Sequence, residues 1–306
     1  MKVLFISSGK LGDVSAVVKN QGDSLVKKGI TIDYFIIRSG IWGYLSGIFK
    51  IRQVYRKGDY DLVHAHYSLS AYVASFSGCR PVVVSLLGSD AFTPLLVKLI
   101  TRFFYKFCWN ITIVKTEEMK SRLKFNNAFV IPNGVNTERF LPIPREVARE
   151  KIGYRMPYYL VVFISNPNRQ EKNFKLAKEA VDIINRTDKI VELMPVFNIP
   201  NDEIPYFINA SNAVILTSKH EGGVNIIKEA MACNVPFVST DVGDVKENSK
   251  GIAGCYVCEH SADAIAENLL KAIEVERSNG RERIIQLGLN SEQVAGKLIS
   301  IYNSVK

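Results

Sequence analysis

Short runs of consecutive hydrophobic residues alternate with longer amphipathic stretches along most of the chain. In the first half, such runs predict β-strands at residues 3–7, 31–37, 62–65, 82–86, 111–114 and 129–131. In the second half they recur at residues 158–164, 189–195, 213–216, 237–239 and 255–257, with helices expected at 173–184 and 262–277. Apolar runs separated by helical patterns are typical of parallel sheets whose strands are joined by crossover helices. The pattern therefore predicts an α/β fold.

The alternation breaks once, in a segment that holds several prolines between Pro132 and Pro144. Prolines and a loss of periodicity commonly mark the boundary between two domains. With 306 residues, the chain has room for two domains that each bury a core of their own. We expect an N-terminal domain of residues 1–144, a C-terminal domain of residues 145–290, and a final helix, residues 291–306, that packs back across the domains.

The composition is that of a soluble globular protein, with 47% hydrophobic and 23% charged residues. No stretch reaches the roughly 18 apolar residues that a membrane span requires, and the first apolar run is too short for a signal peptide. The five cysteines are odd in number and scattered, which favours reduced thiols and a cytoplasmic location. Cys255, Cys258 and His260 lie close together in the sequence, but the alternation of this segment favours a strand over a metal site.

Two carboxylates, Glu221 and Glu229, stand on either side of a glycine pair in residues 220–236. We expect Glu221 at the carboxyl end of a buried strand and Glu229 on the second turn of a helix over residues 225–233. In an open parallel sheet this edge binds ligands, and the N–H groups at a helix start attract phosphate. Two anions suit hydroxyl groups better than phosphate, so the pattern favours a nucleotide sugar. A capped surface helix with a solvated Glu229 is the alternative. The predicted donor-binding residues of this segment are Glu229, Gly222, Gly223, Val224, Asn225 and Ile226.

Two other strand-to-helix turns carry candidate ligands. Arg169 and Lys172 follow the first strand of the second half and are expected to face the same crevice, the arginine as a fork and the lysine as a point charge. With Glu221 they form the predicted catalytic set, and a solvated loop is the alternative. Gly9 and Gly12 follow the first strand of the chain, where glycine lets a backbone approach a phosphate. Two glycines without a complete dinucleotide-binding pattern fit an ordinary tight turn equally well.

Asp59 and Asp61 form the kind of acidic triplet that holds Mg²⁺ or Mn²⁺ for a diphosphate. They precede a strand, whereas ligands in such sheets bind where strands end, so we interpret the triplet as a solvated turn and predict no metal site. His64 and His66 are expected on opposite faces of the strand that follows. One of them should be buried, while His66, together with Tyr67, should lie where the strand opens into a cleft.

Basic and aromatic residues are interleaved in residues 94–110, where Lys98, Arg102 and Lys106 recur at every fourth position. Residues 39–57 show a similar mixture. Such helices suit an anionic membrane surface, although core helices with a solvated basic face are the alternative. The first 150 residues hold 21 Lys/Arg against 11 Asp/Glu, so the positive charge is concentrated in this half. No nucleic-acid-binding signature is present, and nucleic acid is not an expected partner.

Two phrases of the sequence together resemble the family 4 retaining glycosyltransferases. Residues 221–233 with residues 238–244 resemble the donor-binding signature of that family, and residues 130–140 resemble its inter-domain phrase. The resemblance covers nearly the whole chain and implies the GT-B fold, in which two Rossmann-like domains have parallel sheets facing a central cleft. It also implies that Glu229 holds the nucleotide ribose, that Glu221 lies against the donor sugar, and that Arg169 and Lys172 hold the diphosphate without a metal.

The chain departs from this family in three respects. The family commonly has an arginine five positions before its lysine, where this chain has Pro167. Residues 81–90 resemble a segment that usually carries a donor-contacting histidine at the position of Leu87. Asp90, which closes this segment, is assigned with His66 and Tyr67 to the acceptor side. The chain is also short for the family, which trimmed loops in the acceptor half would explain.

The sequence thus predicts a metal-independent retaining glycosyltransferase. It would move a sugar from a UDP- or GDP-linked donor to a glycan or lipid-linked acceptor in surface-polysaccharide biosynthesis, with no cofactor beyond the donor. Lys98, Arg102 and Lys106 would place it on an anionic membrane surface at the inner face. Two alternatives stay open: a GT-B nucleotide-sugar epimerase, and a catalytically silent subunit that binds a sugar nucleotide.

Overall fold

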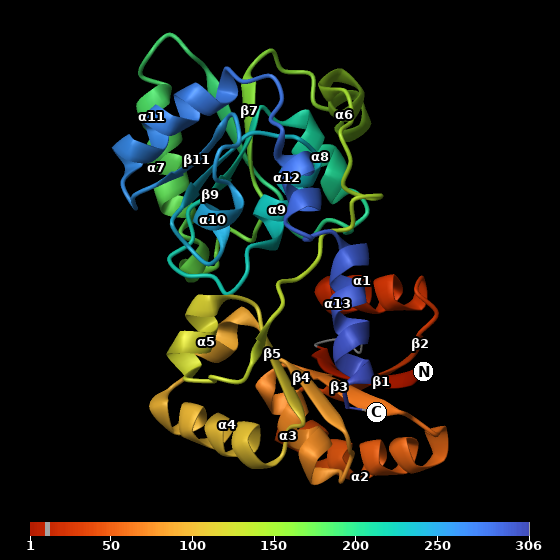
Figure 1. The fold of residues 1–306 in the computed structure, drawn as a ribbon. Helices are drawn as coiled ribbons and strands as arrows, with labels where there is room; N and C mark the ends of the chain where they lie inside the picture. Colours follow the sequence, from red (N-terminus) through yellow and green to blue (C-terminus); the bar gives the residue numbers. More distant parts are fainter. Residues whose placement is uncertain (10–12, 306) are drawn as a thin grey trace. The chain divides into compact units, whose positions relative to one another are not determined.

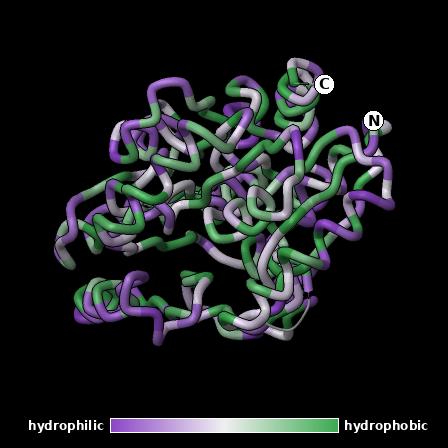
Figure 2. Tube along the Cα trace, turned by 90° about the horizontal axis from the view of Figure 1, so that it is seen from below, coloured by the Kyte–Doolittle hydropathy of each residue, from purple (hydrophilic) through white to green (hydrophobic). Residues whose placement is uncertain are grey.

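The computed structural model describes residues 1–9 and 13–305. Its contacts divide the chain into two compact units, one of residues 1–134 with 291–306 and the other of residues 135–290. Each unit contains one parallel sheet with helices on both faces (Figure 1). The predicted fold class, with two parallel-sheet α/β domains, is therefore confirmed. The helices contain both hydrophobic and hydrophilic residues along their length, as expected of helices that bury one side (Figure 2).

The N-terminal unit is built on a six-stranded parallel sheet with the strand order β2-β1-β3-β4-β5-β6. Its strands lie close to the predicted apolar runs: β1 (Lys2–Gly9), β2 (Thr31–Arg38), β3 (Leu62–His66), β4 (Val82–Ser85), β5 (Ile111–Val114) and β6 (Phe129–Val130). The strands β3 to β5 are almost entirely buried, which explains why their sequences are continuous apolar runs rather than alternating ones.

Different helices cover the two faces of this sheet. On one face, α1 (Ala16–Val26) and α13 (Ser291–Asn303) pack over Val3 and Phe5. On the other face, Leu4 and Ile6 contact a second core that includes side chains of four helices and one 3-10 helix. These are α2 (Ile41–Gly58), α3 (Ser68–Phe76), η1 (Gly88–Phe92), α4 (Leu95–Phe107) and α5 (Glu117–Leu123).

The C-terminal unit contains a five-stranded parallel sheet with the order β11-β10-β9-β7-β8. The strands are β7 (Tyr159–Phe163), β8 (Val191–Pro195), β9 (Ala213–Leu216), β10 (Phe237–Thr240) and β11 (Cys255–Cys258). One face is covered by α7 (Phe174–Ile184) and α11 (Ala262–Ile273). The other is covered by α6 (Arg145–Ile152), α8 (Ile204–Ala210), α9 (Asn225–Ala232) and α12 (Gly280–Gln286). Two short helices, η2 (Gln170–Lys172) and α10 (Val245–Asn248), lie in the connections after β7 and β10.

The two units divide after Gly134, earlier in the chain than the expected boundary at residue 144. Residues 135–144, which include Pro142 and Pro144, belong to the C-terminal unit because their backbone is hydrogen-bonded there. The Ile143 N–H donates to Asn209 Oδ1 at 2.9 Å, and the Arg281 guanidinium donates to Phe140 O at 2.8 Å. The prolines therefore mark irregular chain, and the packing divides between Pro132 and Pro142.

The final helix, predicted to pack across the domains, is grouped with the N-terminal unit. There α13 lies against α1, and its Tyr302 hydroxyl is 2.6 Å from His64 Nδ1 in β3. Tyr302 is fully buried, and burial raises its pKa well above the ordinary value. The last residues of the chain thus complete the core that the first strand begins.

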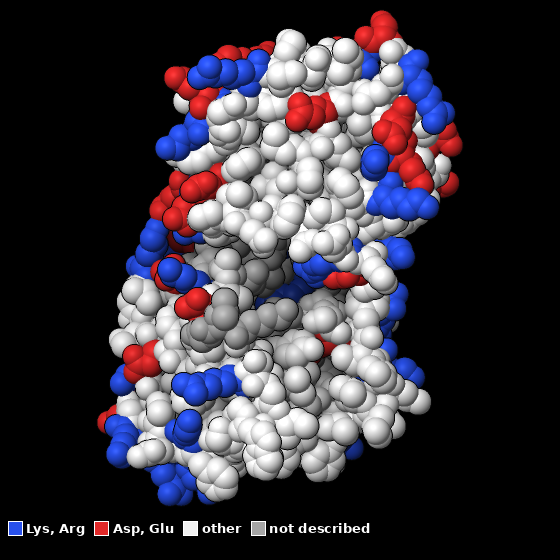
Figure 3. Space-filling model, turned by 180° about the vertical axis from the view of Figure 1, so that it is seen from behind, with Lys and Arg blue, Asp and Glu red and all other residues white. Residues whose placement is uncertain are grey.

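Residues 135–290 hold 19 Lys/Arg against 21 Asp/Glu, so the net positive charge lies in the N-terminal unit, which holds 20 against 9. On the face shown in Figure 3, its Lys and Arg side chains gather along one margin beside a broad uncharged area with few Asp or Glu. Within the described ranges, 1–9 and 13–305, no helix has the combination of length and apolar character that crossing a membrane requires.

Candidate functional site

The order in which the chain adds strands to the C-terminal sheet reverses at β7. This strand pairs with β8 on one side and with β9 on the other, so the chain passes to one edge and then returns past β7. In open parallel sheets, the loops that leave the strands beside such a switch point diverge around a crevice, and ligands bind there. The loops after β7 and after β9 are the ones that carry Lys172 and Glu221, so the topology itself brings these two predicted residues together.

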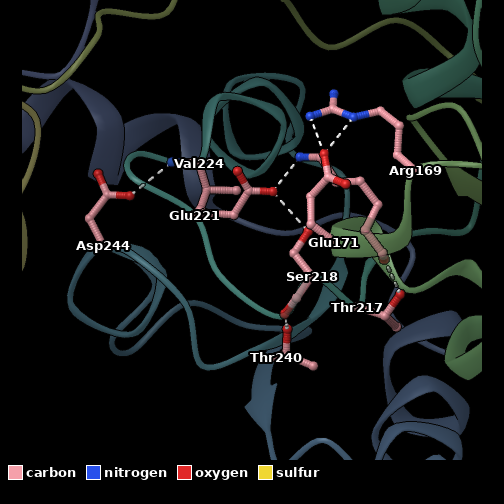
Figure 4. Close-up of polar contacts among 9 residues, drawn as sticks. Arg169, Glu171, Thr217, Ser218, Glu221, Val224, Thr240 and Asp244 are labelled. Atoms are coloured by element: carbon pink, nitrogen blue, oxygen red, sulfur yellow. Dashed lines mark hydrogen bonds and ion pairs between the residues drawn. The ribbon is translucent and has the colours of Figure 1, made fainter. Parts of the chain in front are cut away.

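Lys172 and Glu221 form an ion pair between these two loops. Their side chains are only 15% and 18% exposed, so water screens the pair less than it would at the surface. Glu221 Oε1 also accepts a hydrogen bond from Ser218 Oγ at 2.8 Å (Figure 4). The Thr217 hydroxyl donates to the carbonyl oxygens of Lys172 and Asn173, which fixes the backbone that carries the lysine. The structure thus joins the two loops by side-chain and backbone contacts.

Arg169 points to a different partner. Its guanidinium contacts Glu171 Oε1, with Nε at 2.7 Å and one terminal nitrogen at 2.6 Å, and its side chain is 56% exposed (Figure 4). The Glu171 carbonyl accepts the Lys219 N–H at 2.9 Å, so this pair stands beside the loop after β9. The pKa of Glu171 is lowered, chiefly by a backbone hydrogen bond and also by Arg169. The role of Arg169 in holding a diphosphate stays a prediction.

Glu229 lies on the second turn of α9, as the sequence predicts. Burial raises its pKa to about 7, although Lys228 and Arg139 favour the charged form and part of the side chain remains accessible to solvent. No hydrogen bond to its carboxylate is formed by any residue in the described part of the chain. Glu229 therefore has both oxygens available to accept hydroxyl groups, and its charge state changes near neutral pH.

The glycine loop, residues 221–224, lies between the two carboxylates and is held by Asp244. Gly222 is buried, and the Val224 N–H donates to Asp244 Oδ1 at 3.2 Å (Figure 4). This N–H was among the groups expected to meet a phosphate, and in the structure a carboxylate already accepts from it. Asn225 and Ile226, the other predicted members of this set, are the first two residues of α9.

Gly9 ends β1 in a position that tolerates no side chain. A Cβ at this residue would lie 2.5 Å from the Asp13 carbonyl oxygen and 3.0 Å from Ile36. This close packing accounts for the glycine without a ligand, which favours the tight-turn interpretation. Gly12, predicted with it, lies outside the described residues.

The expectation that His64 and His66 lie on opposite faces of β3 is wrong. Residues two apart in a strand share a face, and the two rings stack with centroids 4.4 Å apart. Both are buried rather than one, and His66 Nε2 has no hydrogen-bond partner among the described residues. Burial, with the nearby Lys115 ammonium, lowers the pKa of His66 to about 3 and keeps the ring neutral. His66 therefore lies in the core at the end of β3 and does not open into a cleft.

Tyr67 directly follows β3, and Asp90 lies in η1, which follows the neighbouring strand β4. Tyr67 has a φ of 79°, and its N–H donates to the Ser85 carbonyl at 2.9 Å. Asp90 is buried and accepts the N–H groups of Leu87 at 2.7 Å and Ser68 at 3.2 Å. Burial raises the Asp90 pKa to about 6 despite these bonds. Asp90 thus fixes the backbone at the start of α3, and the acceptor-side assignment of both residues stays a prediction.

The acidic triplet is engaged within the N-terminal unit. Asp61 Oδ2 accepts the Lys2 N–H at 2.7 Å, and Asp59 ends α2 in the left-handed conformation. In residues 1–9 and 13–305, no group of three or more His, Cys, Asp or Glu side chains is arranged to hold a metal ion.

Sequence reasoning missed the residues that support the donor loops. Thr217 and Ser218 follow β9 directly, so their polar side chains at the end of a buried strand were a visible signal. Lys228 and Asp244 were harder to find, because a lysine in a helix usually lies at the solvent, whereas Lys228 is only 1% exposed.

Two family models match the chain one after the other. The model described as Glycosyltransferase Family 4 matches residues 12–139, and the model described as Glycosyl transferases group 1 matches residues 161–274. The chain belongs to the family 4 glycosyltransferases. One similar protein is the putative teichuronic acid biosynthesis glycosyltransferase TuaC of Bacillus subtilis, 26% identical over 237 residues. That alignment covers 69% of this glycosyltransferase and 61% of TuaC, so the chain spans less than two thirds of this relative.

Solved structures establish the fold of this glycosyltransferase independently. The sucrose-phosphate synthase of Thermosynechococcus elongatus superposes with a TM-score of 0.79 at 17% identity, covering 99% of this chain and 98% of that one. Anabaena Alr3699/HepE, in complex with UDP-glucose, has a TM-score of 0.75 at 15% identity, covering 99% and 100%. At these identities the likeness concerns the fold alone, which is that of the GT-B glycosyltransferases.

The first prediction concerns Glu229. Replacing Glu229 with Gln should weaken UDP or GDP binding by about 1.5–3 kcal/mol, or roughly 10- to 100-fold, because hydrogen bonds to a charged acceptor are lost. Because the Glu229 pKa is about 7, wild-type affinity should fall as the pH is lowered through 7 and the carboxylate gains a proton. Isothermal titration calorimetry across this range tests both effects. The variant should retain only the pH dependence of the nucleotide's own phosphate, and superimposable curves would contradict the assignment.

The second prediction concerns Lys172. Lys172→Ala should weaken binding of a nucleoside diphosphate by about tenfold or more and leave the free nucleoside nearly unchanged, because only the phosphates meet the ammonium. Lys175→Ala is the matched control, since Lys175 is 86% exposed on the same connection. Equal losses for diphosphate and nucleoside would show that Lys172 does not reach the phosphates.

Proposed function

We propose that this glycosyltransferase moves a sugar from a UDP- or GDP-linked donor to a glycan or lipid-linked acceptor in surface-polysaccharide biosynthesis. Transfer would retain the anomeric configuration and need no metal. The observation that carries the proposal is the Lys172–Glu221 pair at the switch point of the C-terminal sheet, with Glu229 on the helix that follows. This set offers one cation and two carboxylates at a place where parallel sheets bind ligands.

In this proposal the Lys172–Glu221 contact is exchanged when the donor binds. A diphosphate carries more negative charge than one carboxylate and would draw the Lys172 ammonium to itself. Glu221, still held by Ser218, would then accept hydroxyl groups of the sugar, while Glu229 accepts those of the ribose. Lys172 would stabilise the negative charge that develops on the leaving diphosphate. Catalysis would come from positioning and electrostatics rather than from a covalent step on the protein.

Metal-independent transfer is supported by the chemistry of the site. The Lys172 ammonium supplies the positive charge that a divalent cation supplies to a diphosphate in other enzymes. The acidic triplet belongs to the N-terminal unit, where Asp61 accepts a backbone N–H. The proposal therefore assigns the diphosphate to Lys172, with Arg169 as its expected second cation.

The names of similar proteins support the substrate class. TuaC is named for teichuronic acid biosynthesis, and the HepE structure was solved with UDP-glucose. These names favour a nucleotide sugar as donor and a polysaccharide intermediate as acceptor. Two alternatives are distinguished by turnover: an epimerase would convert the donor without an acceptor, and a silent subunit would bind the donor without converting it. Leu87, at the position of the usual histidine, is the feature that favours the silent subunit.

The third prediction tests this function. A thermal-shift screen with UDP, GDP, ADP and CMP should identify the base, and the matching nucleotide sugar should then be hydrolysed or transferred at the same rate with and without EDTA. The released or transferred sugar should keep the anomeric configuration of the donor by NMR. An inverted product, or a loss of activity with EDTA that Mn²⁺ restores, would contradict the mechanism. Binding without any turnover would favour the silent subunit.

We also propose that the N-terminal unit docks on an anionic membrane. Two of its helices expose apolar stripes with a four-residue period. Leu95, Leu99, Phe103 and Phe107 on α4 are between 51% and 69% exposed, and Ile41, Leu45 and Phe49 on α2 are between 48% and 78% exposed. Both helices cover the same face of the sheet, so both stripes turn outward on one side of the unit. Exposed apolar patches of this extent mark interaction sites.

The basic residues beside α4 are divided between two tasks. Arg102 Nε donates to the Leu123 carbonyl at 3.0 Å, so this side chain holds the end of α5. Lys98 is partly exposed and Lys106 is exposed, so both are available to anionic headgroups. The stripe predicted from Lys98, Arg102 and Lys106 is thus mainly an apolar stripe with two flanking lysines. Such a helix binds in the interfacial plane of a bilayer.

The fourth prediction tests this docking. Cosedimentation with liposomes should rise with the anionic lipid fraction and fall in high salt, and Lys98→Ser with Lys106→Ser should weaken binding about 30-fold, at about 1 kcal/mol per lysine. Phe103→Ser with Phe107→Ser should reduce it at every lipid composition. A double control, Lys178→Ser with Arg186→Ser, removes the same charge from exposed positions of the C-terminal unit and should change nothing. Indifference of the wild type to lipid charge would leave α4 as a sheet-covering helix.

A further inference from the structure

Lys228 is a buried lysine in a helix whose other buried residues are apolar. Its side chain is 1% exposed, although α9 buries mainly Ile227, Ala230 and Met231 on the same unit's core. Lysine is almost never fully buried unless a charge compensates it, because removing an ammonium from water is costly. An apolar residue would fit this place without that cost. The burial of Lys228 therefore needs an explanation beyond packing.

The compensating charge is Asp244, in the connection between β10 and α10. Lys228 Nζ lies 3.6 Å from Asp244 Oδ2, and the Asp244 side chain is 10% exposed. Neither of these two atoms has a hydrogen-bond partner in the described part of the chain. The other oxygen, Asp244 Oδ1, accepts the Val224 N–H at 3.2 Å. One carboxylate thus serves two purposes, neutralising Lys228 and holding the residue that precedes α9.

These contacts surround the loop that begins at Glu221 and leads into α9, the helix that carries Glu229. Gly243 adopts a φ of 58°, and a Cβ there would lie 3.3 Å from Val224 Cγ2 and 3.5 Å from the Glu221 carbonyl oxygen. The loop from Glu221 to Val224 therefore lies against Gly243 and Asp244. From the other direction, Ser218 and Lys172 hold the Glu221 carboxylate. Lys228 immediately precedes Glu229, so Asp244 is linked both to the helix that carries Glu229 and to Val224 at the end of the glycine loop.

We propose that the buried Lys228–Asp244 pair positions the donor loop, holding Glu221 and Glu229 at the separation that a nucleotide sugar requires. This inference rests on the proposed function and adds two positioning residues to it. A role in stability alone would not explain the pair, since two apolar residues of similar size usually stabilise a core as well as a buried ion pair does. Asp244, however, fixes the Val224 N–H, and an apolar residue has no acceptor with which to do so.

The test separates the charge of the pair from the hydrogen bond to Val224. Asp244→Asn and Lys228→Met each leave one buried charge without its partner, and each should weaken UDP or GDP binding by about tenfold. The double variant Lys228→Met with Asp244→Asn removes both charges and keeps an acceptor for Val224. It should recover nucleotide affinity to within about threefold of the wild type, and this rescue is a result that a merely structural role would not give.

A second double variant, Lys228→Met with Asp244→Ala, removes the acceptor as well. It should remain folded by circular dichroism and bind the nucleotide about tenfold more weakly than the first double variant. If it does not fold, Asp244→Asn alone supplies the comparison with the wild type. Folded variants that all bind as the wild type does would overturn the positioning role.

The exposed pair Lys271–Glu267 on α11 provides the control. Its Nζ and Oε1 atoms are 2.6 Å apart, but its side chains are 52% and 69% exposed. Lys271→Met and Glu267→Gln should leave affinity unchanged. If the wild-type chain binds neither UDP nor GDP, the proposed donor fails and this inference with it. If the wild type binds and Asp244→Asn binds equally well, only the positioning role fails.

Discussion

The geometry of the candidate site depends on one constraint, the parallel pairing of β7 with a strand on each side. Because all strands of the sheet run in one direction, the loops that leave β7 and β9 emerge at the same edge. Lys172 and Glu221 are distant in the sequence and meet only because of this order. Thr217, Ser218 and Asp244 then fix the loops with hydrogen bonds that depend on the same register. If β9 paired elsewhere, none of these contacts could form.

The apolar pattern predicted the elements of the fold well, because buried parallel strands such as β5 and β9 are uninterrupted apolar runs. It also placed Glu221 and Glu229 correctly along their elements. It could not predict that Lys228 is buried, because a helical pattern shows which face is apolar and not which charge will meet a lone lysine there. Asp244 becomes the partner of Lys228 only because two segments that are distant in the sequence meet in the fold. His64 and His66 are two residues apart, so the period of a strand places them on one face and not on opposite faces. The prolines before residue 144 indicated irregular chain, but the boundary between the units is set by packing and lies after Gly134.

The two units use charge in different ways. In the C-terminal unit two ion pairs, Lys172–Glu221 and Lys228–Asp244, are largely buried, and hydrogen bonds tie the same segments to the neighbouring backbone. In the N-terminal unit the interior of β3 holds neutral imidazoles, and the exposed helices combine apolar stripes with scattered lysines. The first arrangement favours a defined small ligand, and the second favours a broad, weakly specific surface. This division agrees with one unit that holds the donor and one that approaches the acceptor.

The grouping of α13 with the N-terminal unit has a consequence for the order in which the protein is made. Val3 and Phe5 lie in β1, yet the helix that covers them, with Leu298 and Tyr302, follows the whole C-terminal unit in the sequence. During translation, at about 5–20 residues per second, this face of the sheet has to wait until the C-terminal unit and α13 have been synthesised. The C-terminal unit is continuous in sequence and has no such delay. The apolar face of the nascent N-terminal sheet therefore stays uncovered until α13 has emerged.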